Sequence, residues 1–209
     1  MNLRATSGPE DWHPQEFSRT LRRMVRNANP AVICLCMGGN EHNILGVAEH
    51  PEPFSVGDSA EGSAPADPDR WFVPRAVMRD ALREYLEPVR RLNEIACETF
   101  ADSVKVFLSP PPPIADWEHI QSHPGVFREA LDLGPAPNAL RMALYRLQVE
   151  LLREMAARAG AAFIGPPDEA LDGDGFLAKR YFDGSPTHAN DDYGAILLRA
   201  ILERAEPAT

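Results

Sequence analysis

The chain has 209 residues, of which 44% are hydrophobic and 25% are charged, and this composition fits one globular domain with a sizeable core. Its formal net charge of -10 and its isoelectric point near 5.1 argue against nucleic acid or an anionic membrane as a partner, because either requires a basic surface. No apolar run has the length of a signal-peptide core or of a membrane span, so we expect a cytoplasmic chain.

The amino-terminal part of the chain predicts a helix followed by a buried strand. A helical pattern opens at Pro14, and Pro30 stops it just before the next segment. Residues 31 to 37 are apolar without alternation, which is typical of a parallel strand covered on both faces. The cysteines are too few for a disulfide framework, and we expect small core residues at Cys34, Cys36 and Cys97.

This predicted strand stops abruptly at Gly38, Gly39 and Asn40. Ligands of open α/β sheets bind at the carboxyl ends of the strands, and glycines let the backbone come close to a ligand. The turn offers backbone N–H groups and the side-chain amide of Asn40, and donors of this kind form oxyanion holes. His42 follows in the same loop, where it either contacts a substrate or packs the loop.

Helices and strands alternate through the rest of the chain. Residues 50 to 70 are rich in proline, glycine, serine and acidic residues, and we expect an irregular surface excursion or lid there. A long amphipathic helix is predicted from Pro74 to about Phe100, with a kink at Pro88. The remaining predicted elements are a strand over 104–108, a helix over 139–159, a strand over 161–164 and a helix over 190–204. This order predicts one domain over residues 1–209, an α/β fold built as a three-layer α/β/α sandwich with a parallel sheet.

A second group of polar residues precedes the last predicted helix. Asp183 and His188 lie in one turn-rich loop, where a carboxylate can orient the imidazole ring. Such a pair takes a proton from a hydroxyl or from water as a general base. The alternative is that His188 merely precedes or caps the final helix.

Together, the two loops resemble signatures of the SGNH/GDSL hydrolase family. GGNE at residues 38–41 is similar to the family's Gly-x-Asn-Asp block, and His188 matches the histidine of its Asp-x-x-His block. The resemblance implies a flavodoxin-like fold and hydrolysis of a small acyl ester, an acetylated sugar or a thioester through Ser, His and Asp. It implies that Asn40 and the adjacent glycines bind the oxyanion, that His188 is the base and that Asp183 orients it. Asp183 lies five residues before His188, where the family pattern has three.

The family's nucleophile block, Gly-Asp-Ser after an amino-terminal strand, has no match ahead of the GGNE turn. Residues 57–59 spell the motif, but no strand is predicted before Ser59 and no helix after it, so Ser59 is a poor nucleophile. Other available hydroxyls are Ser7 and Ser109. Gly8 is similar to the family's oxyanion glycine, and this match predicts that a strand and a Gly-Asp-Ser turn lie upstream of the sequence given.

No cofactor or metal site is expected. His119 and His123 have the spacing of a metal pair, but Pro124 and the lack of an apolar partner face favour a solvated turn. An acidic loop is similar to a calcium site in composition alone, and its acidic residues are Asp168, Glu169, Asp172 and Asp174. Three aromatic side chains flank the expected lid loops, where they line a pocket or pack the lid, namely Trp71, Phe72 and Trp117.

Two functions from different classes stay open. The first is an ester hydrolase with a small-molecule substrate, and the second is a non-catalytic domain of the same fold that binds or scaffolds. In the flavodoxin-like strand order, a missing first strand would leave an unpaired apolar edge beside residues 31–37. We therefore expect association with another chain, such as a homo-oligomer.

Overall fold

The structure is a computed structural model that describes residues 14–25, 28–58 and 67–205, and it is mixed α/β. Its main sheet contains three parallel strands in the order β1 (Val32–Leu35), β4 (Val104–Leu108) and β5 (Ala162–Ile164). The strands are shorter than predicted by up to three residues, since the carboxyl end of the first leaves the sheet at Leu35. Gly8, Ser7 and Ser59 lie outside the described residues.

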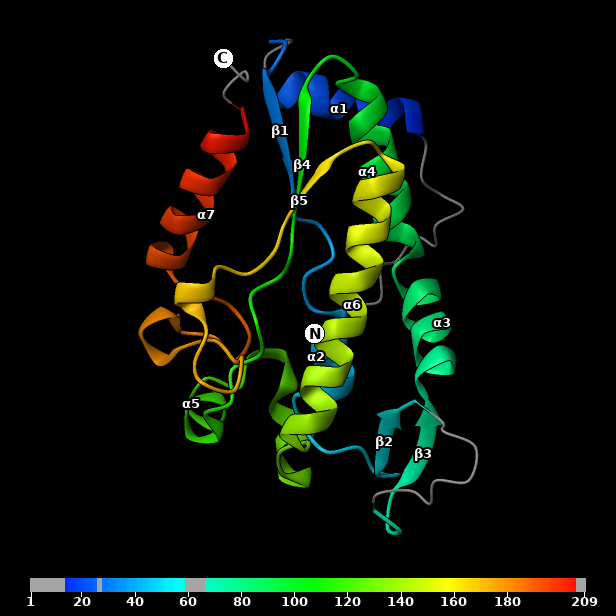
Figure 1. Ribbon diagram of the computed structural model, residues 1–209, viewed down its shortest axis with the longest axis vertical. Coiled ribbons are helices and arrows are strands. Elements are labelled where there is room, and N and C mark those ends of the chain that lie inside the picture. The colour runs from blue at the N-terminus through cyan, green and yellow to red at the C-terminus, as the bar shows by residue number, and fades with distance from the viewer. Residues whose placement is uncertain (1–13, 26–27, 59–66, 206–209) are drawn as a thin grey trace.

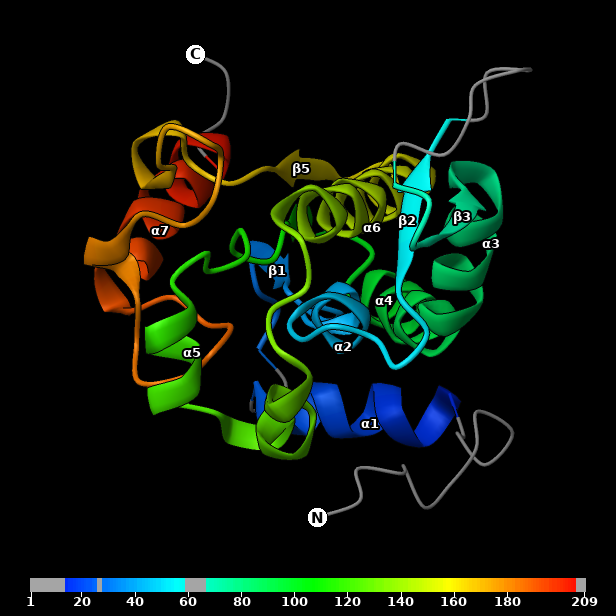
Figure 2. The same ribbon diagram turned by 90° about the horizontal axis from the view of Figure 1, so that it is seen from below.

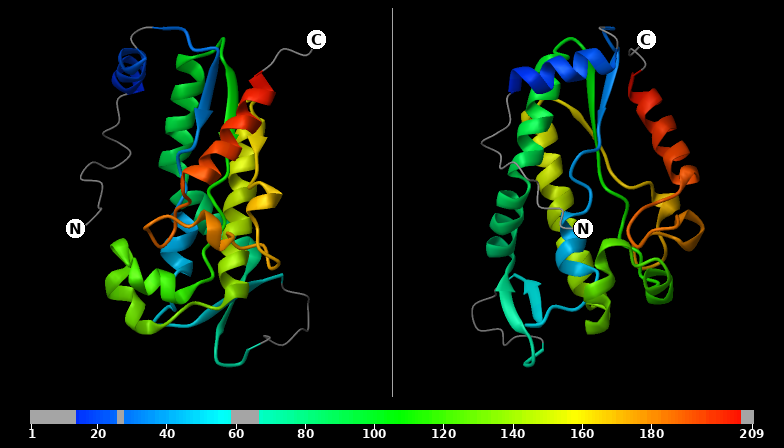
Figure 3. Two further views of the ribbon diagram at one scale, coloured as in Figure 1. Left: turned by 90° about the vertical axis from the view of Figure 1, so that its left-hand side faces the viewer. Right: turned by 180° about the vertical axis from the view of Figure 1, so that it is seen from behind.

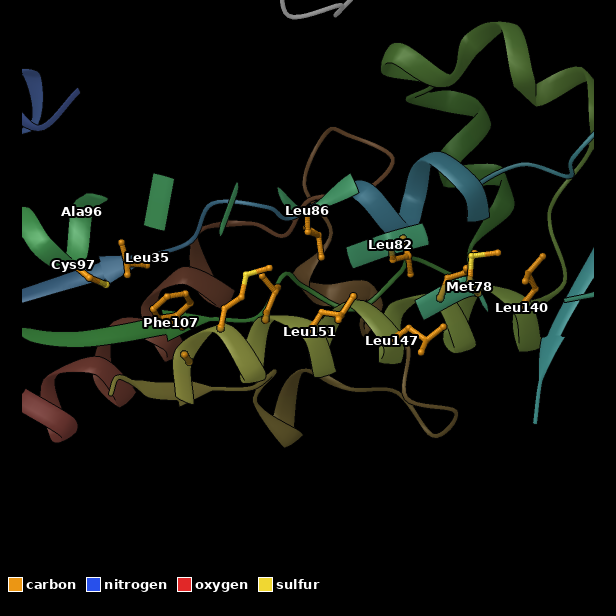
Figure 4. Close-up of a cluster of buried hydrophobic side chains, with 14 of the residues drawn as sticks. Leu35, Met78, Leu82, Leu86, Ala96, Cys97, Phe107, Leu140, Leu147 and Leu151 are labelled. Carbon is orange, nitrogen blue, oxygen red and sulfur yellow. The ribbon is translucent and has the colours of Figure 1, made fainter. Parts of the chain in front are cut away.

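Side chains alternate between two apolar cores on the two faces of this sheet. One core joins Leu35 and Phe107 to α3 (Arg75–Tyr85), α4 (Glu87–Thr99) and α6 (Asn138–Arg158). Figure 4 shows these two side chains in line with Leu82, Leu86 and Leu151. The other core joins the opposite side chains of β4 and β5 to α7 (Asp191–Ala205), which lies on the other side of the sheet in Figure 1. The strands therefore have the apolar character that buried parallel strands require.

The cysteines in and just after β1 are not the small core residues that we expected. Cys34 and Cys36 are exposed, whereas Cys97 on α4 is buried as expected. Cys34 shares with Val32 the face of β1 that points toward α7, and α7 packs against β5, the strand at the other edge of the sheet. An apolar run predicts a strand, but it does not tell whether the strand lies at the centre or at the edge of the sheet.

In the described part of the chain, β1 pairs with β4 alone and so forms one edge of the sheet. This position agrees with the expectation of an unpaired edge beside residues 31–37. Such an edge presents a row of backbone donors and acceptors to other chains.

The segment expected to be an irregular excursion contains regular structure. Strand β2 (Phe54–Gly57) pairs in parallel with β3 (Trp71–Pro74), which leads directly into α3. This small sheet packs against α3 and α6 at the end of the molecule seen in Figure 2. Phe54 is buried in the first core, and Val56 and Val73 pack against the same core, so these side chains anchor the small sheet where no periodicity was evident.

The long helix predicted from Pro74 to Phe100 is divided in two. Helix α3 ends at Tyr85 and α4 begins at Glu87, with Leu86 between them. Pro88 occupies the first turn of α4, where its missing N–H costs no hydrogen bond. The predicted kink is therefore present as a break.

The segments that follow the carboxyl ends of the strands gather at one end of the sheet (Figure 1). They include α2 (Glu41–Gly46) after β1, α5 (Trp117–Ser122) after β4, and the loops around the short helical turns Asp168–Ala170 and Lys179–Tyr181 after β5. A further short helix spans Gly125–Leu133. Helix α1 (Pro14–Met24) lies across the opposite end, as Figure 3 shows.

Candidate functional site

A pocket of about 420 Å³ opens at the carboxyl ends of β1 and β4. Its wall comes from three parts of the chain, namely the turn after β1, the proline-rich segment after β4, and the start of α7. The lining residues are Cys36, Gly39, Asn40, Glu41, Leu108, Ser109, Pro110, Pro111, His188, Tyr193 and Leu197. Another pocket, of about 280 Å³, lies along α4 and contains none of the candidate residues.

Asn40 and His188, which are 148 residues apart, meet in this pocket. Their side-chain nitrogens, Asn40 Nδ2 and His188 Nε2, are 3.4 Å apart. Asn40 ends the turn after β1, and His188 lies in the long segment between β5 and α7. Both residues therefore follow the carboxyl end of a strand. The predicted convergence of the two loops is therefore present.

The side chain of Asn40 has a defined orientation. Asn40 stands just before the first residue of α2, but its side chain does not cap that helix. Its Oδ1 instead accepts a hydrogen bond of 2.9 Å from Asn43 Nδ2. The N–H₂ end of the Asn40 amide is left facing His188 and the pocket.

The partner of the His188 ring is Ser185, which corrects the role expected for Asp183. Ser185 Oγ lies 2.8 Å from His188 Nδ1 and also accepts the backbone N–H of His188 at 3.0 Å. Asp183 Oδ1 instead accepts the backbone N–H of Ser185 at 2.8 Å. A carboxylate five residues before the ring folds back on its own loop, as aspartates in turns do. Ser185 stands three residues before His188, the position that the family pattern gives to its aspartate.

A buried glutamine on α6 holds the turn after β1. Gln148 is 0% exposed, and its Oε1 accepts the backbone N–H of His42 at 2.7 Å. Its Nε2 donates to the carbonyl of Gly38 and to Glu41 Oε2, both at 2.6 Å. The amide thus uses both of its ends on one loop, which fixes the start of α2 against α6.

His42 packs this loop and does not line the pocket. Its Nδ1 lies 2.9 Å from Gln148 Oε1, and its ring stands beside that of Tyr145. Burial, aided by the nearby cation of Arg141, lowers the pKa of His42 to about 4, although the bond to Gln148 opposes this shift. The ring is therefore neutral at pH 7, and its Nδ1–H donates to Gln148. Of the two roles left open for His42, the structure favours loop packing.

The two glycines of the turn have different roles. Gly38 has a φ of 88°, and a Cβ there would lie 2.7 Å from Val89 Cγ1 on α4. Gly39 has ordinary backbone geometry and lines the pocket. Gly38 thus allows the chain to turn against α4, and Gly39 brings backbone to the pocket wall.

No hydroxyl among the described residues contacts His188 Nε2. Ser109 lines the pocket, but it is only 5% exposed and lies beside the Tyr145 phenol. Burial raises the pKa of Tyr145 and that of Tyr193, so neither phenol ionises readily. The exposed nucleophile of the pocket wall, among the described residues, is the thiol of Cys36.

The weaker sequence candidates form structural contacts. His119 lies on α5 rather than in a solvated turn, its ring stacks on His123 with centroids 4.5 Å apart, and its Nε2 is 2.9 Å from the Ser185 carbonyl oxygen. Asp172 accepts backbone N–H groups of its own loop. Over the described ranges, no group of three His, Cys, Asp or Glu side chains is arranged to hold a metal ion. Trp117 packs in the second core, whereas Trp71 is exposed.

No protein-family model matches the sequence, and no curated protein matches it. Within the described residues, no helix is long and apolar enough to cross a membrane.

Proposed function

We propose that the pocket between Asn40 and His188 is the site of an ester hydrolase of the SGNH type, in a flavodoxin-like three-layer sandwich. The observation that carries this proposal is the 3.4 Å approach of the Asn40 amide to His188 Nε2 in a pocket at the carboxyl edge of a parallel sheet. A hydrogen-bond donor and an imidazole base at such an edge are two of the groups that acyl transfer uses, besides the nucleophile. The apolar cores on both faces of the sheet support the sandwich.

The geometry assigns a role to each side chain. Because Asn40 Nδ2 faces His188 Nε2, Nε2 carries the lone pair and Nδ1–H points to Ser185 Oγ. An ester carbonyl oxygen that enters the pocket takes the N–H of Asn40, which stabilises negative charge on that oxygen in the tetrahedral state. His188 Nε2 is then free to take a proton from the attacking hydroxyl and to return it to the leaving alkoxide. The attacking group is a serine hydroxyl outside the described residues, or water.

The charges of the pocket wall favour an uncharged substrate. The described residues that line it include no arginine or lysine, and the one carboxylate among them is that of Glu41. A phosphate or a carboxylate on the substrate would therefore find no counter-ion and would be repelled by Glu41. Small neutral acyl esters fit this wall best.

A second candidate function is binding without turnover, and the contact at Nδ1 favours it. A hydroxyl at 2.8 Å supplies no negative charge to stabilise the imidazolium that a base becomes. The described residues also place no hydroxyl on Nε2. A pocket of this kind would bind a carbonyl compound through Asn40 and release it unchanged.

Hydrolysis of p-nitrophenyl acetate by the 209-residue chain separates the two candidates. The hydrolase predicts turnover that is weak but above the buffer rate, because the oxyanion donor and the pocket act even without an activated nucleophile. His188→Ala is expected to abolish this turnover, and Asn40→Ala to reduce it by about a hundred-fold. Saturable binding of p-nitrophenyl acetate with the same turnover in wild type, His188→Ala and Asn40→Ala would instead establish the binding function.

A further inference from the structure

Asn43 is the side chain that contacts the proposed oxyanion donor most directly. It lies in α2 and is 4% exposed, and its Nδ2 is 2.9 Å from Asn40 Oδ1. The backbone N–H of Asn43 also donates to the Asn40 carbonyl at 3.0 Å, so the two residues share one helical turn. Asn43 does not line the pocket and is not in contact with His188. Any effect that it has on the pocket therefore passes through Asn40.

An asparagine amide presents opposite polarity at its two ends. With Oδ1 held by a donor, Nδ2 must face the pocket, and it lies 3.4 Å from His188 Nε2. If the amide were turned over, Oδ1 would face the pocket and would repel a carbonyl oxygen. It would also accept a hydrogen bond from Nε2–H, which would place the His188 proton on the nitrogen that a base needs free.

We propose that Asn43 is a positioning residue that sets the polarity of the pocket, because its N–H donation fixes the N–H₂ end of Asn40 toward the bound ligand. The same contact selects the His188 tautomer with a free Nε2. This inference rests on the proposed function for its effect on rate, but its effect on the orientation of Asn40 is independent of any activity.

The backbone under this pair is held by other groups, so a change in the side-chain contact can turn the Asn40 amide without moving the loop. Gln148 bonds to the carbonyl of Gly38 and to the N–H of His42, which are the residues on either side of the turn. A substitution at Asn43 that keeps its size therefore leaves the loop in place. Asn43→Asp has this property, and its carboxylate can only accept hydrogen bonds.

The test compares Asn43→Asp, Asn43→Ala and wild type by two measurements. The first is the nuclear Overhauser effect between the side-chain amide protons of Asn40 and Hε1 of His188. The second is the His188-dependent hydrolysis of p-nitrophenyl acetate. In Asn43→Asp the Asn40 amide turns its N–H₂ toward the new carboxylate, so we expect the Overhauser contact to disappear and hydrolysis to fall by about a hundred-fold, as in Asn40→Ala. Asn43→Ala removes the donor without imposing the inverse orientation, so we expect a smaller loss.

The control is Asn138→Asp, which adds the same charge at an exposed position at the start of α6 and should change neither measurement. A persistent Overhauser contact and unchanged hydrolysis in Asn43→Asp would overturn the inference. If wild type shows no His188-dependent hydrolysis, the proposed function fails while the Overhauser measurement still decides the role of Asn43. If Asn43→Asp does not fold, a contact as strong in Asn43→Ala as in wild type overturns the inference, and a weakened contact supports it.

Discussion

Ser185 places a neutral hydroxyl oxygen beside His188 Nδ1. At this position a negatively charged oxygen would stabilise the protonated ring of a hydrolytic base. Ser185 Oγ, 2.8 Å from His188 Nδ1, can accept the ring proton but cannot balance the positive charge that the ring acquires. The carboxylate of Asp183 accepts a hydrogen bond from the backbone N–H of Ser185 instead. The His188 ring is therefore oriented, but this contact supplies no negative charge to stabilise its protonated form.

Ser185→Asp should convert this contact into an ion pair during proton transfer. The new carboxylate can still accept the backbone N–H of His188, so the loop geometry is retained. We expect at least about a ten-fold increase in p-nitrophenyl acetate hydrolysis, and no increase for Ser122→Asp, which adds the same charge at an exposed position on α5. Equal rates for Ser185→Asp and wild type would show that His188 does not act as a base.

His42 makes the stability of the protein depend on pH. Its pKa is lowered from 6.5 to about 4, mainly by burial, so the folded state keeps the ring neutral while the unfolded state takes up a proton. The contribution is fully present above pH 6.5 and is lost as the pH falls toward 4, and it amounts to about 3 kcal/mol at most. Urea unfolding followed from pH 7.5 to 4.5 should show this loss in wild type. His42→Leu should reduce it, and an identical pH dependence in both proteins would contradict the assignment.

At the scale of elements, the turn after β1 is held by α6 rather than by its own sequence. Gln148 satisfies a carbonyl, a carboxylate and a backbone N–H within this turn, and all of them are reached from one side chain. Gly38 has a positive φ, and this backbone conformation brings the turn against Val89 of α4. Helices α4 and α6 thus fix the loop that presents Asn40.

Two substitutions at Gln148 separate hydrogen bonding from packing. Gln148→Leu leaves the Gly38 carbonyl and the His42 N–H unpaired, and we expect the free energy of unfolding to fall by about 3 kcal/mol. Gln148→Glu places a carboxylate against the Gly38 carbonyl and Glu41, so it should be destabilising at pH 7 and less so near pH 5, where a protonated carboxyl regains a donor. Chemical denaturation at both pH values measures these free energies of unfolding. A Gln148→Leu protein as stable as wild type would refute the role of Gln148 in holding the turn.

At the scale of the whole molecule, the open edge of β1 is the feature from which we expect association. The strand at this edge is apolar, and it carries the exposed thiol of Cys34 on one face. Charged side chains at a sheet edge are a common means of preventing edge-to-edge pairing, and β1 has none.

We therefore expect the 209-residue chain to self-associate in reducing buffer, and Cys34→Lys to shift it toward the monomer. Sedimentation velocity over a range of concentrations measures both species. An exposed substitution away from the edge, Val77→Lys on α3, is the control and should leave association unchanged. A wild-type chain that is monomeric at all concentrations would disprove this expectation.

The sequence determined the strands of the main sheet, several of the long helices and one site pair, because these are evident in local patterns. Apolar runs ended by glycine or proline located β1, β4 and β5 within three residues, and helical spacing located α1, α6 and α7. The resemblance of the two loops to the SGNH/GDSL signatures, together with the rule that the carboxyl ends of parallel strands share one edge, predicted that Asn40 and His188 would meet, and they do.

Only the tertiary structure decided which groups support that pair. Gln148 stands in an apolar helix more than a hundred residues from the loop it holds, and nothing in its own neighbourhood marks it. Ser185 had a visible signal, its place three residues before His188, but an aspartate nearby was the stronger chemical candidate. The exposure of Cys34 followed from the place of β1 in the sheet, which depends on pairing between distant segments and not on the composition of the strand itself.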